Sequence, residues 1–228
     1  MPQDPTRPNT RVAYGSPARE SVLDTNKVLR NTYALLSMTL LFSAAMAGAS
    51  VVFNVPYFGP IVTLVGYFGL LFLTTKFRNS SAGIACVFAL TGFMGLTLGP
   101  LLSLYLQTDN GTSLVMTALG STGIVFLGLS AYAVKSQRDF SFMGGFLMVG
   151  MLGLLAVILL GLFIDLSAIQ MAISAGVVLL MSALILYQTS SIIHGGETNY
   201  IMATVTLFVS IYNLFTNLLF LLGMGGDD

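Results

Sequence analysis

The chain has 228 residues, of which 55% are hydrophobic and 8% are charged, and its mean hydropathy is +0.87. Soluble domains carry about 25% charged residues, so this chain cannot cover itself with a water-facing surface and must be an integral membrane protein. Its net charge of zero gives no broad attraction to nucleic acid. The apolar residues form continuous blocks, which argues against the two-residue alternation of a membrane β-barrel.

Residues 1–30 are rich in Pro, Arg, Asn and Ser, and this composition predicts a disordered N-terminal tail. Near the end of the tail, Asp24 or Thr25 is placed to cap a helix that runs into the membrane.

Residues 31–224 form the predicted membrane domain, and residues 225–228 a short acidic C-terminus. A bilayer-spanning helix needs about 20 apolar residues. Seven apolar segments fit this need, near Tyr33–Phe53, Ile61–Thr75, Ala82–Leu106, Ser113–Val134, Phe142–Ile164, Ala168–Tyr187 and Tyr200–Leu222. The linkers are short, so successive helices should be antiparallel neighbours. The sequence therefore predicts an all-α bundle of seven transmembrane helices.

The basic residues all fall on one side of such a bundle, in the tail and in the linkers that follow the second and fourth helices. They are Arg7, Arg11, Arg19, Lys27, Arg30, Lys76, Arg78, Lys135 and Arg138. Cytoplasmic loops carry an excess of Lys and Arg. We therefore expect the N-terminus in the cytoplasm and the C-terminus on the other side of the membrane.

Small residues recur at four-residue spacing in the first and third helices, at Ser43/Ala47, Ala44/Gly48 and Gly95/Gly99. This spacing lets helix backbones approach closely in lipid. Pro100 follows Gly99 and should kink the third helix, because proline removes a backbone donor.

Ionisable residues are almost absent from the predicted helices, since Asp109 lies in a linker and Asp165 at a helix end. Ion and proton pathways usually hold such residues inside the membrane. The sequence also has no paired carboxylates, no Ser/His/Asp set and no two-histidine spacing. We expect no catalytic residue, no metal site, no cofactor and no small-molecule substrate.

The last predicted helix carries a polar stripe, formed by Thr206, Ser210, Asn213 and Asn217 on one helical face. Uncharged polar groups in lipid should turn inward and hydrogen-bond to a neighbouring helix. The stripe serves either in packing or as the lining of a narrow polar cavity, and the sequence leaves both interpretations open.

The linker before that helix holds the only histidine of the chain, in the run His194, Gly195, Gly196 and Glu197. One interpretation is a tight cytoplasmic turn in which the glycines end one helix and Thr198 or Asn199 caps the next, with Glu197 near its positively polarised N-terminus. The alternative is a contact with a partner or a weak pH sensor at His194.

The stretch "IIHGGETNY" and the helices around it resemble the Bax inhibitor-1 family. The resemblance extends from about residue 27 to the C-terminus, through "KVLRNTYALLSMTL", "TGFMGLTLGP" and "SFMGGFLMVG". It is strongest to the YccA branch, bacterial inner-membrane proteins that modulate the FtsH protease. The resemblance implies two hairpins of transmembrane helices around a central last helix, in the bacterial inner membrane.

The resemblance implies two functions. One is binding and restraint of the membrane-anchored, ATP-dependent protease FtsH, with the protein itself a slowly degraded substrate. The other is a pH-sensitive calcium leak, which the family attributes to members with an aspartate pair on the last two helices. At those two positions this chain has Gln188 and Ser210. Neither side chain titrates, whereas two nearby carboxylates can share a proton, so we favour the protease partner.

Overall fold

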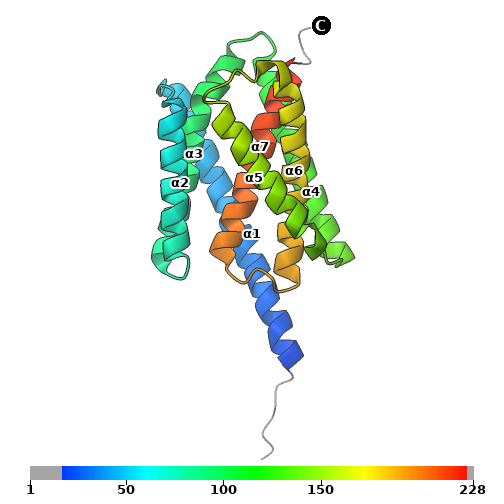
Figure 1. Ribbon diagram of the computed structural model, residues 1–228. Helices are drawn as coiled ribbons and strands as arrows, with labels where there is room; N and C mark the ends of the chain where they lie inside the picture. The colour runs from blue at the N-terminus through cyan, green and yellow to red at the C-terminus, as the bar shows by residue number, and fades with distance from the viewer. Residues whose placement is uncertain (1–16, 225–228) are drawn as a thin grey trace, which may run out of the picture.

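The computed structural model describes the backbone of residues 17–224 and the side chains of residues 27–224 (Figure 1). Its helices are joined by short linkers. They are α1 (Pro17–Val52), α2 (Gly59–Phe77), α3 (Ser81–Leu106), α4 (Gly111–Ser136), the 3-10 turn η1 (Ser141–Met143), α5 (Gly144–Leu160), the 3-10 turn η2 (Ser167–Ile169), α6 (Gln170–Ile193) and α7 (Tyr200–Met224).

Seven of these helices are long and apolar enough to cross a membrane, as the sequence predicts. The N-terminal boundary was wrong, because α1 begins at Pro17 and residues 17–30 are helical rather than part of a disordered tail. The N-terminal end of α1 continues past the bundle (Figure 1). The rest of the expected tail, residues 1–16, and the expected acidic C-terminus, residues 225–228, lie outside the described residues.

Two other boundaries differ from the hydropathy pattern. We expected the sixth helix to end at Tyr187, but α6 continues to Ile193. Its polar last turns are buried against neighbouring helices, and Thr189 Oγ1 lies 3.2 Å from the Tyr33 hydroxyl of α1. We expected the fifth helix to reach Ile164, but α5 ends at Leu160 and the chain then turns.

Helix α7 lies at the centre of the bundle, packed against α1, α3, α4 and α6 (Figure 1). Half of the residues in its most apolar stretch are buried, compared with 6% for α2 and for α5. Helix α2 packs mainly against α3, and α5 mainly against α6 and η1. These two helices therefore stand at the periphery, and α7 has the central position that the family resemblance implies.

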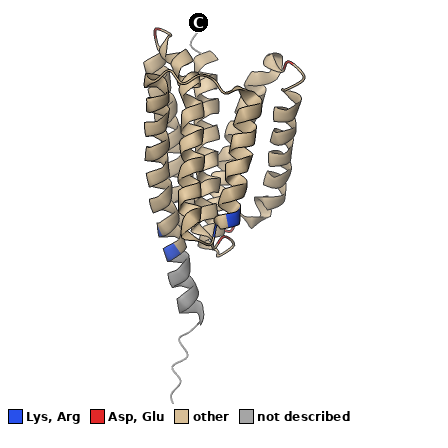
Figure 2. Cartoon of the chain, turned by 90° about the vertical axis from the view of Figure 1, so that its left-hand side faces the viewer, with Lys and Arg blue, Asp and Glu red and all other residues tan. Residues whose placement is uncertain are grey.

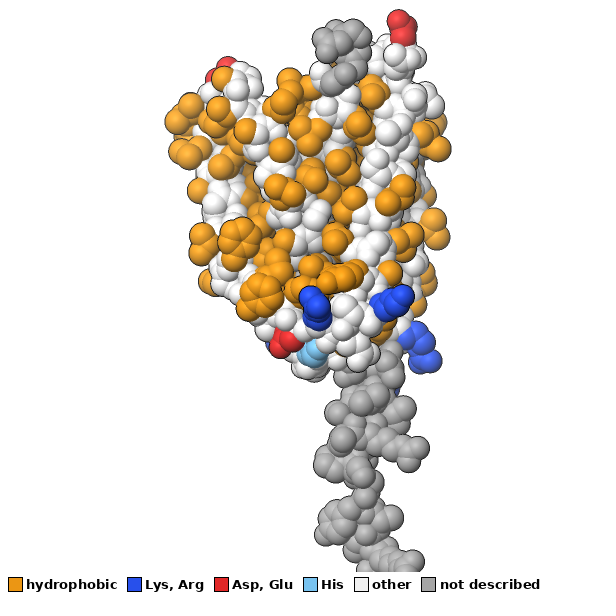
Figure 3. Space-filling model, turned by 90° about the vertical axis from the view of Figure 1, so that its right-hand side faces the viewer, with side chains coloured by type: hydrophobic (Ala, Val, Ile, Leu, Met, Phe, Trp, Pro, Cys, Tyr) orange, Lys and Arg blue, Asp and Glu red, His pale blue; other side chains and the backbone are white. Residues whose placement is uncertain are grey.

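Charged residues lie at the two ends of the bundle (Figures 2 and 3), and apolar side chains are spread over the face drawn in Figure 3. Lys76, Arg78, Lys135 and Arg138 lie at the end where α1 enters, which we call the basic end. Asp109 and Asp165 lie in the linkers at the opposite end, which we call the far end. Many large apolar side chains on the sides are exposed, as expected for a surface that faces lipid.

Glycines of α3 bring its backbone close to α1. A Cβ on Gly95 would lie 2.3 Å from the Ser43 carbonyl oxygen, and one on Gly99 would lie 2.0 Å from Ser50 Oγ. Ala47 of α1 is also buried. The close approach predicted for Ser43/Ala47 and Gly95/Gly99 is therefore confirmed, and we call this contact the α1–α3 seam.

The prediction for Ala44/Gly48 was wrong, because both residues are exposed and a Cβ on Gly48 would meet nothing within 4 Å. A four-residue spacing identifies a helix face but not which face meets a neighbour.

Pro100 lies inside α3 and does not end it, because α3 is one helix from Ser81 to Leu106. Because proline has no backbone N–H, the carbonyl of Leu96 one turn earlier loses its usual donor. Ser50 of α1 supplies the missing hydrogen bond, with its Oγ donating to the Leu96 oxygen over 2.8 Å. The seam thus satisfies a backbone group that would otherwise be unpaired in lipid.

Candidate functional site

The signature run of residues 194–197 forms a tight turn at the basic end, directly after α6. Gly195 has a φ of +73°, in the left-handed region that glycine adopts without strain. The backbone N–H groups of Gly196 and Glu197 both donate to the Ser191 carbonyl, over 2.8 and 3.2 Å. These bonds satisfy a free carbonyl at the end of α6.

His194 joins the end of α6 to the linker between α4 and α5. Its Nδ1 lies 2.9 Å from the Ser190 carbonyl oxygen, and its Nε2 lies 3.2 Å from the Gln137 carbonyl oxygen. A neutral imidazole carries one N–H, so it donates to one of these two carbonyls at a time. Gln137 has a φ of +49°, and this left-handed residue ends α4.

Ser190 makes further bonds to the same linker. Its hydroxyl donates to the Arg138 carbonyl over 3.1 Å and accepts from the Phe140 N–H over 3.1 Å. Beside this contact, the Ser141 hydroxyl and backbone N–H both donate to Asp139. These bonds from Ser141 hold the pKa of the Asp139 carboxyl below its usual value.

Asn199 directly precedes α7 and bonds to the linker between α2 and α3. Its Oδ1 accepts from the N–H groups of Ile201 and Met202, over 3.1 and 3.0 Å, which confirms the expected cap. Its Nδ2 donates to the Arg78 carbonyl and to Asn79 Oδ1, over 3.0 and 2.8 Å.

Glu197 supports this cap, because its Oε1 accepts from the Asn199 N–H over 2.8 Å. The linker between α6 and α7, which contains the turn, is therefore bonded to the α2–α3 and α4–α5 linkers at the basic end. Sequence reasoning identified the turn and its cap but missed the roles of Ser190 and Asn79, whose partners lie far away in the chain.

Gln188 and Ser210 stand where leak-type relatives are expected to carry an acid pair. Both side chains are buried, with 6% and 0% of their surface exposed. Ser210 Oγ donates to the Thr206 carbonyl of its own helix over 2.8 Å. Within the described structure, Gln188 Nε2 has no hydrogen-bond partner. No hydrogen bond therefore joins these two described side chains.

Among the described residues, the side chains of the polar stripe form no hydrogen bond to a neighbouring helix, contrary to our expectation. Asn213 Nδ2 donates to the Val209 carbonyl, and Asn217 Nδ2 to the Asn213 carbonyl, each over 2.8 Å within α7. As with the bond from Ser210 to Thr206, the partner is one turn back in the same helix. A backbone carbonyl one turn back is always within reach of a short polar side chain. These three side chains bond to such a carbonyl instead of to a neighbouring helix.

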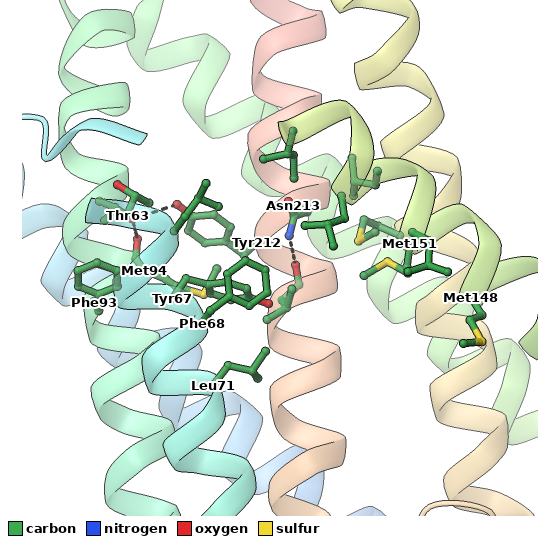
Figure 4. A pocket seen from close by; sticks show the side chains of 18 residues that line it. Thr63, Tyr67, Phe68, Leu71, Phe93, Met94, Met148, Met151, Tyr212 and Asn213 are labelled. Carbon is green, nitrogen blue, oxygen red and sulfur yellow. Dashed lines mark hydrogen bonds between the residues drawn. The ribbon is translucent and has the colours of Figure 1, made fainter. Parts of the chain in front are cut away.

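Two adjoining cavities lie between the peripheral helices α2 and α5, and the stripe reaches both of them. The first, of about 440 Å³, is lined mainly by apolar side chains, with Tyr212 and Asn213 of α7 among them (Figure 4). The second, of about 1200 Å³, extends to the far end and includes Asn217. Asn213 and Asn217 therefore line a cavity, whereas Thr206 and Ser210 do not border either one.

Comparison with known proteins identifies relatives over nearly the full length. The family model described as "Inhibitor of apoptosis-promoting Bax1" matches residues 25–227. A protein of Escherichia coli strain K12 named "Modulator of FtsH protease YccA" is 50% identical over 96% of this chain and 99% of its own. An uncharacterised protein of Pseudomonas aeruginosa is 55% identical over 88% of this chain and 91% of its own. An uncharacterised Neisseria meningitidis protein is 36% identical over 89% and 93%. The chain, a bundle of seven helices with α7 at its centre, belongs to the Bax inhibitor-1 family.

Proposed function

We propose that this chain binds and restrains the membrane-anchored, ATP-dependent protease FtsH, and that the protease degrades it only slowly. It would act by binding, without a chemical reaction of its own. The observation that carries the proposal is the 50% identity, over 96% of the chain, to the Escherichia coli protein named as a modulator of that protease. That similarity covers the membrane helices as well as the signature turn.

We further propose that the basic end faces the cytoplasm of a bacterium, with the protein in the inner membrane. A second relative carries the name "Inner membrane protein YccA", and Lys and Arg concentrate on the cytoplasmic side of membrane proteins. In this orientation α1 begins on the cytoplasmic side of the bundle, because the helix starts at Pro17 and continues past the other helices at the basic end (Figure 1). The N-terminus would then be the part of the chain that a cytoplasmic protease ring meets first.

The packing of α1 offers a physical reason for slow degradation. A protease that pulls on the N-terminus loads α1 before any other helix, and α1 is held by α3 along the seam and by α7. The Thr204 hydroxyl of α7, which donates to the Tyr200 carbonyl over 2.7 Å, also lies 3.3 Å from the Thr32 carbonyl oxygen of α1. Extraction must break these buried contacts together, so the protease would be occupied without rapid turnover.

Deletion of residues 2–25 tests this proposal. FtsH should degrade the full-length protein slowly and the truncated protein not at all, as followed by its half-life after synthesis is stopped. The matched control removes residues 225–228, at the other end of the chain, and should leave the half-life unchanged. Undiminished degradation of the form without residues 2–25 would contradict the proposal. Affinity purification from native membranes should recover the FtsH complex with the tagged protein.

A cation leak is a second candidate, because a cavity from the far end reaches Asn213 and Asn217. The family's pH gate would need titrating groups where this chain has Gln188 and Ser210. Calcium flux into liposomes that hold the purified protein should therefore be absent, or should not change between about pH 6 and pH 8, since amide and hydroxyl side chains do not titrate there. Flux that depends on pH in this range would favour the leak.

A further inference from the structure

The cleft between α2 and α5 opens sideways, toward the lipid. Phe68 of α2 and Leu152 of α5 stand on its two sides with 45% and 57% of their surface exposed. Its floor comes from α3 and α7, with Met94 and Tyr212 among the lining residues (Figure 4). In a membrane, an apolar cleft on the side of the bundle borders the hydrocarbon of the bilayer, so a lipid acyl chain is the ligand that suits it.

The length of the cleft fits one membrane leaflet. The two cavities share Thr63, Leu154 and Asn213 and so lie end to end along the cleft. Along α2 this space extends from Pro60 to Leu71, about 16 Å at roughly 1.5 Å per residue. The hydrocarbon core is about 30 Å thick, so a single acyl chain from the far-end leaflet fills this length. A transmembrane helix of a partner would need a groove about twice as long.

The cleft is apolar at its inner end and more polar at its outer end, just as a lipid molecule is apolar along its acyl chain and polar at its head group. The inner cavity is lined by methionine, leucine and aromatic side chains, as in most sites for apolar ligands. The outer cavity adds amide and hydroxyl groups at Ser167, Gln170 and Asn217, near the far-end surface. These groups can donate hydrogen bonds to phosphate oxygens.

The outer cavity also has a charge preference. Asp165 is the one charged side chain among the described residues that line it. The Ser167 backbone N–H donates to Asp165 Oδ1 over 2.9 Å, and bonding from Ser167 holds the pKa of this carboxyl below its usual value. An ionised carboxylate at the mouth attracts a cationic head group and repels one that carries only negative charge.

We propose that the cleft between α2 and α5 is a specific binding site for one phospholipid with an ammonium head group. The acyl chain lies between α2 and α5 against α7, and the head group lies at the far end beside Asp165. The proposed lipid site does not depend on the proposed protease function, because the reasons for it are the cavity and the charge at its mouth.

Tryptophan fluorescence gives a direct test, because the chain has no tryptophan of its own. Leu152→Trp places a reporter at the edge of the cleft. Ile124→Trp on α4, with 75% of the native side chain exposed and outside both cavities, is the matched control. Each protein, purified in detergent, is titrated with phosphatidylethanolamine that carries bromine on its acyl chains, which quenches nearby tryptophan.

Quenching at Leu152→Trp should saturate near one lipid per protein, while quenching at Ile124→Trp should rise gradually without saturation. Asp165→Asn in the Leu152→Trp background should weaken binding of the ethanolamine lipid about two- to fivefold, the range of an exposed ion pair. Binding of brominated phosphatidylglycerol should become no weaker, because the substitution removes a negative charge that repels it. Equal, unsaturated quenching at both reporters would mean ordinary surface lipid only and would overturn the proposal. So would a Leu152→Trp signal that responds to the purified FtsH complex and not to lipid.

Discussion

The close contact at the α1–α3 seam predicts that Gly99→Ala destabilises the protein. The new Cβ would lie 2.0 Å from Ser50 Oγ and 2.3 Å from Ser50 Cβ, whereas real Cβ atoms essentially never approach a neighbour closer than 3.0 Å. The two helices must therefore separate by about an ångström. Separation also breaks the bond from Ser50 to the Leu96 carbonyl, which Pro100 leaves without an alternative donor.

The magnitude follows from these two effects. Overpacking of a core costs about 1–3 kcal/mol, and a side-chain hydrogen bond within a membrane contributes about 0.6 kcal/mol on average and up to about 1.7. Gly99→Ala should therefore lower the free energy of unfolding by roughly 2–4 kcal/mol. Ser50→Ala loses the hydrogen bond alone and should lower it by about 0.6–1.7 kcal/mol.

The double variant Gly99→Ala/Ser50→Gly isolates the steric part. It removes both Ser50 side-chain atoms that the new methyl group meets and leaves only the Ser50 backbone carbon, at 3.1 Å, so it should be more stable than Gly99→Ala, in which the hydrogen bond is already broken. Gly99→Ala/Ser50→Ala keeps the Ser50 Cβ and should give no such rescue. The free energies come from unfolding in mixed detergent and dodecyl sulfate micelles, followed by circular dichroism.

Gly48→Ala is the control, because it adds the same methyl group to α1 where nothing lies within 4 Å. It should change the free energy of unfolding by no more than about 0.5 kcal/mol. A Gly99→Ala protein as stable as the native one would refute the close contact. A double variant with Ser50→Gly that is no better than Gly99→Ala would refute its steric cause.

Two further predictions concern the basic end. Asn199→Ala should destabilise the protein by about 1–2 kcal/mol in the same unfolding assay, because α7 loses its cap and the tie to Asn79; Thr198→Ala is the control, and an equal loss in both variants would contradict the cap. Ser141→Ala should raise the pKa of Asp139, measured by carboxyl NMR titration, because the Ser141 hydroxyl bond holds it low. Since the folded pKa is lowered, the stabilisation from Asp139 is present above the ordinary aspartate pKa of about 3.9 and fades as the pH falls through the folded value. An unchanged pKa in Ser141→Ala would show that the hydroxyl bond does not set it.

Local chemistry was enough to predict several parts of this structure. Apolar blocks of sufficient length predicted seven membrane helices, and the glycine pair of the signature run predicted the turn that ends α6. Asn199 was one of two expected caps, and it bonds to Ile201 and Met202. Each of these features depends on residues that are near one another in the chain, so the sequence alone is enough to predict it.

Hydropathy failed where packing decides. The polar end of α6 lowers the average that marks a membrane helix, yet Gln188 and Thr189 stay helical because neighbouring helices bury them. The small residues of α1 show the same limit, since Ser43/Ala47 face α3 and Ala44/Gly48 face outward. Both pairs have the same spacing, and only the position of α3 distinguishes them.

The sequence by itself determined that this is a seven-helix membrane protein with its basic residues at one end, because length, apolarity and charge are properties of single segments. The tertiary structure decided which distant groups meet. It placed Ser50 on the carbonyl that Pro100 frees, and Asn199 on Asn79. It also formed the cleft between α2 and α5 from helices that do not adjoin in the chain. Such contacts depend on how helices pack side by side, and the spacing of residues along one helix does not specify its neighbour.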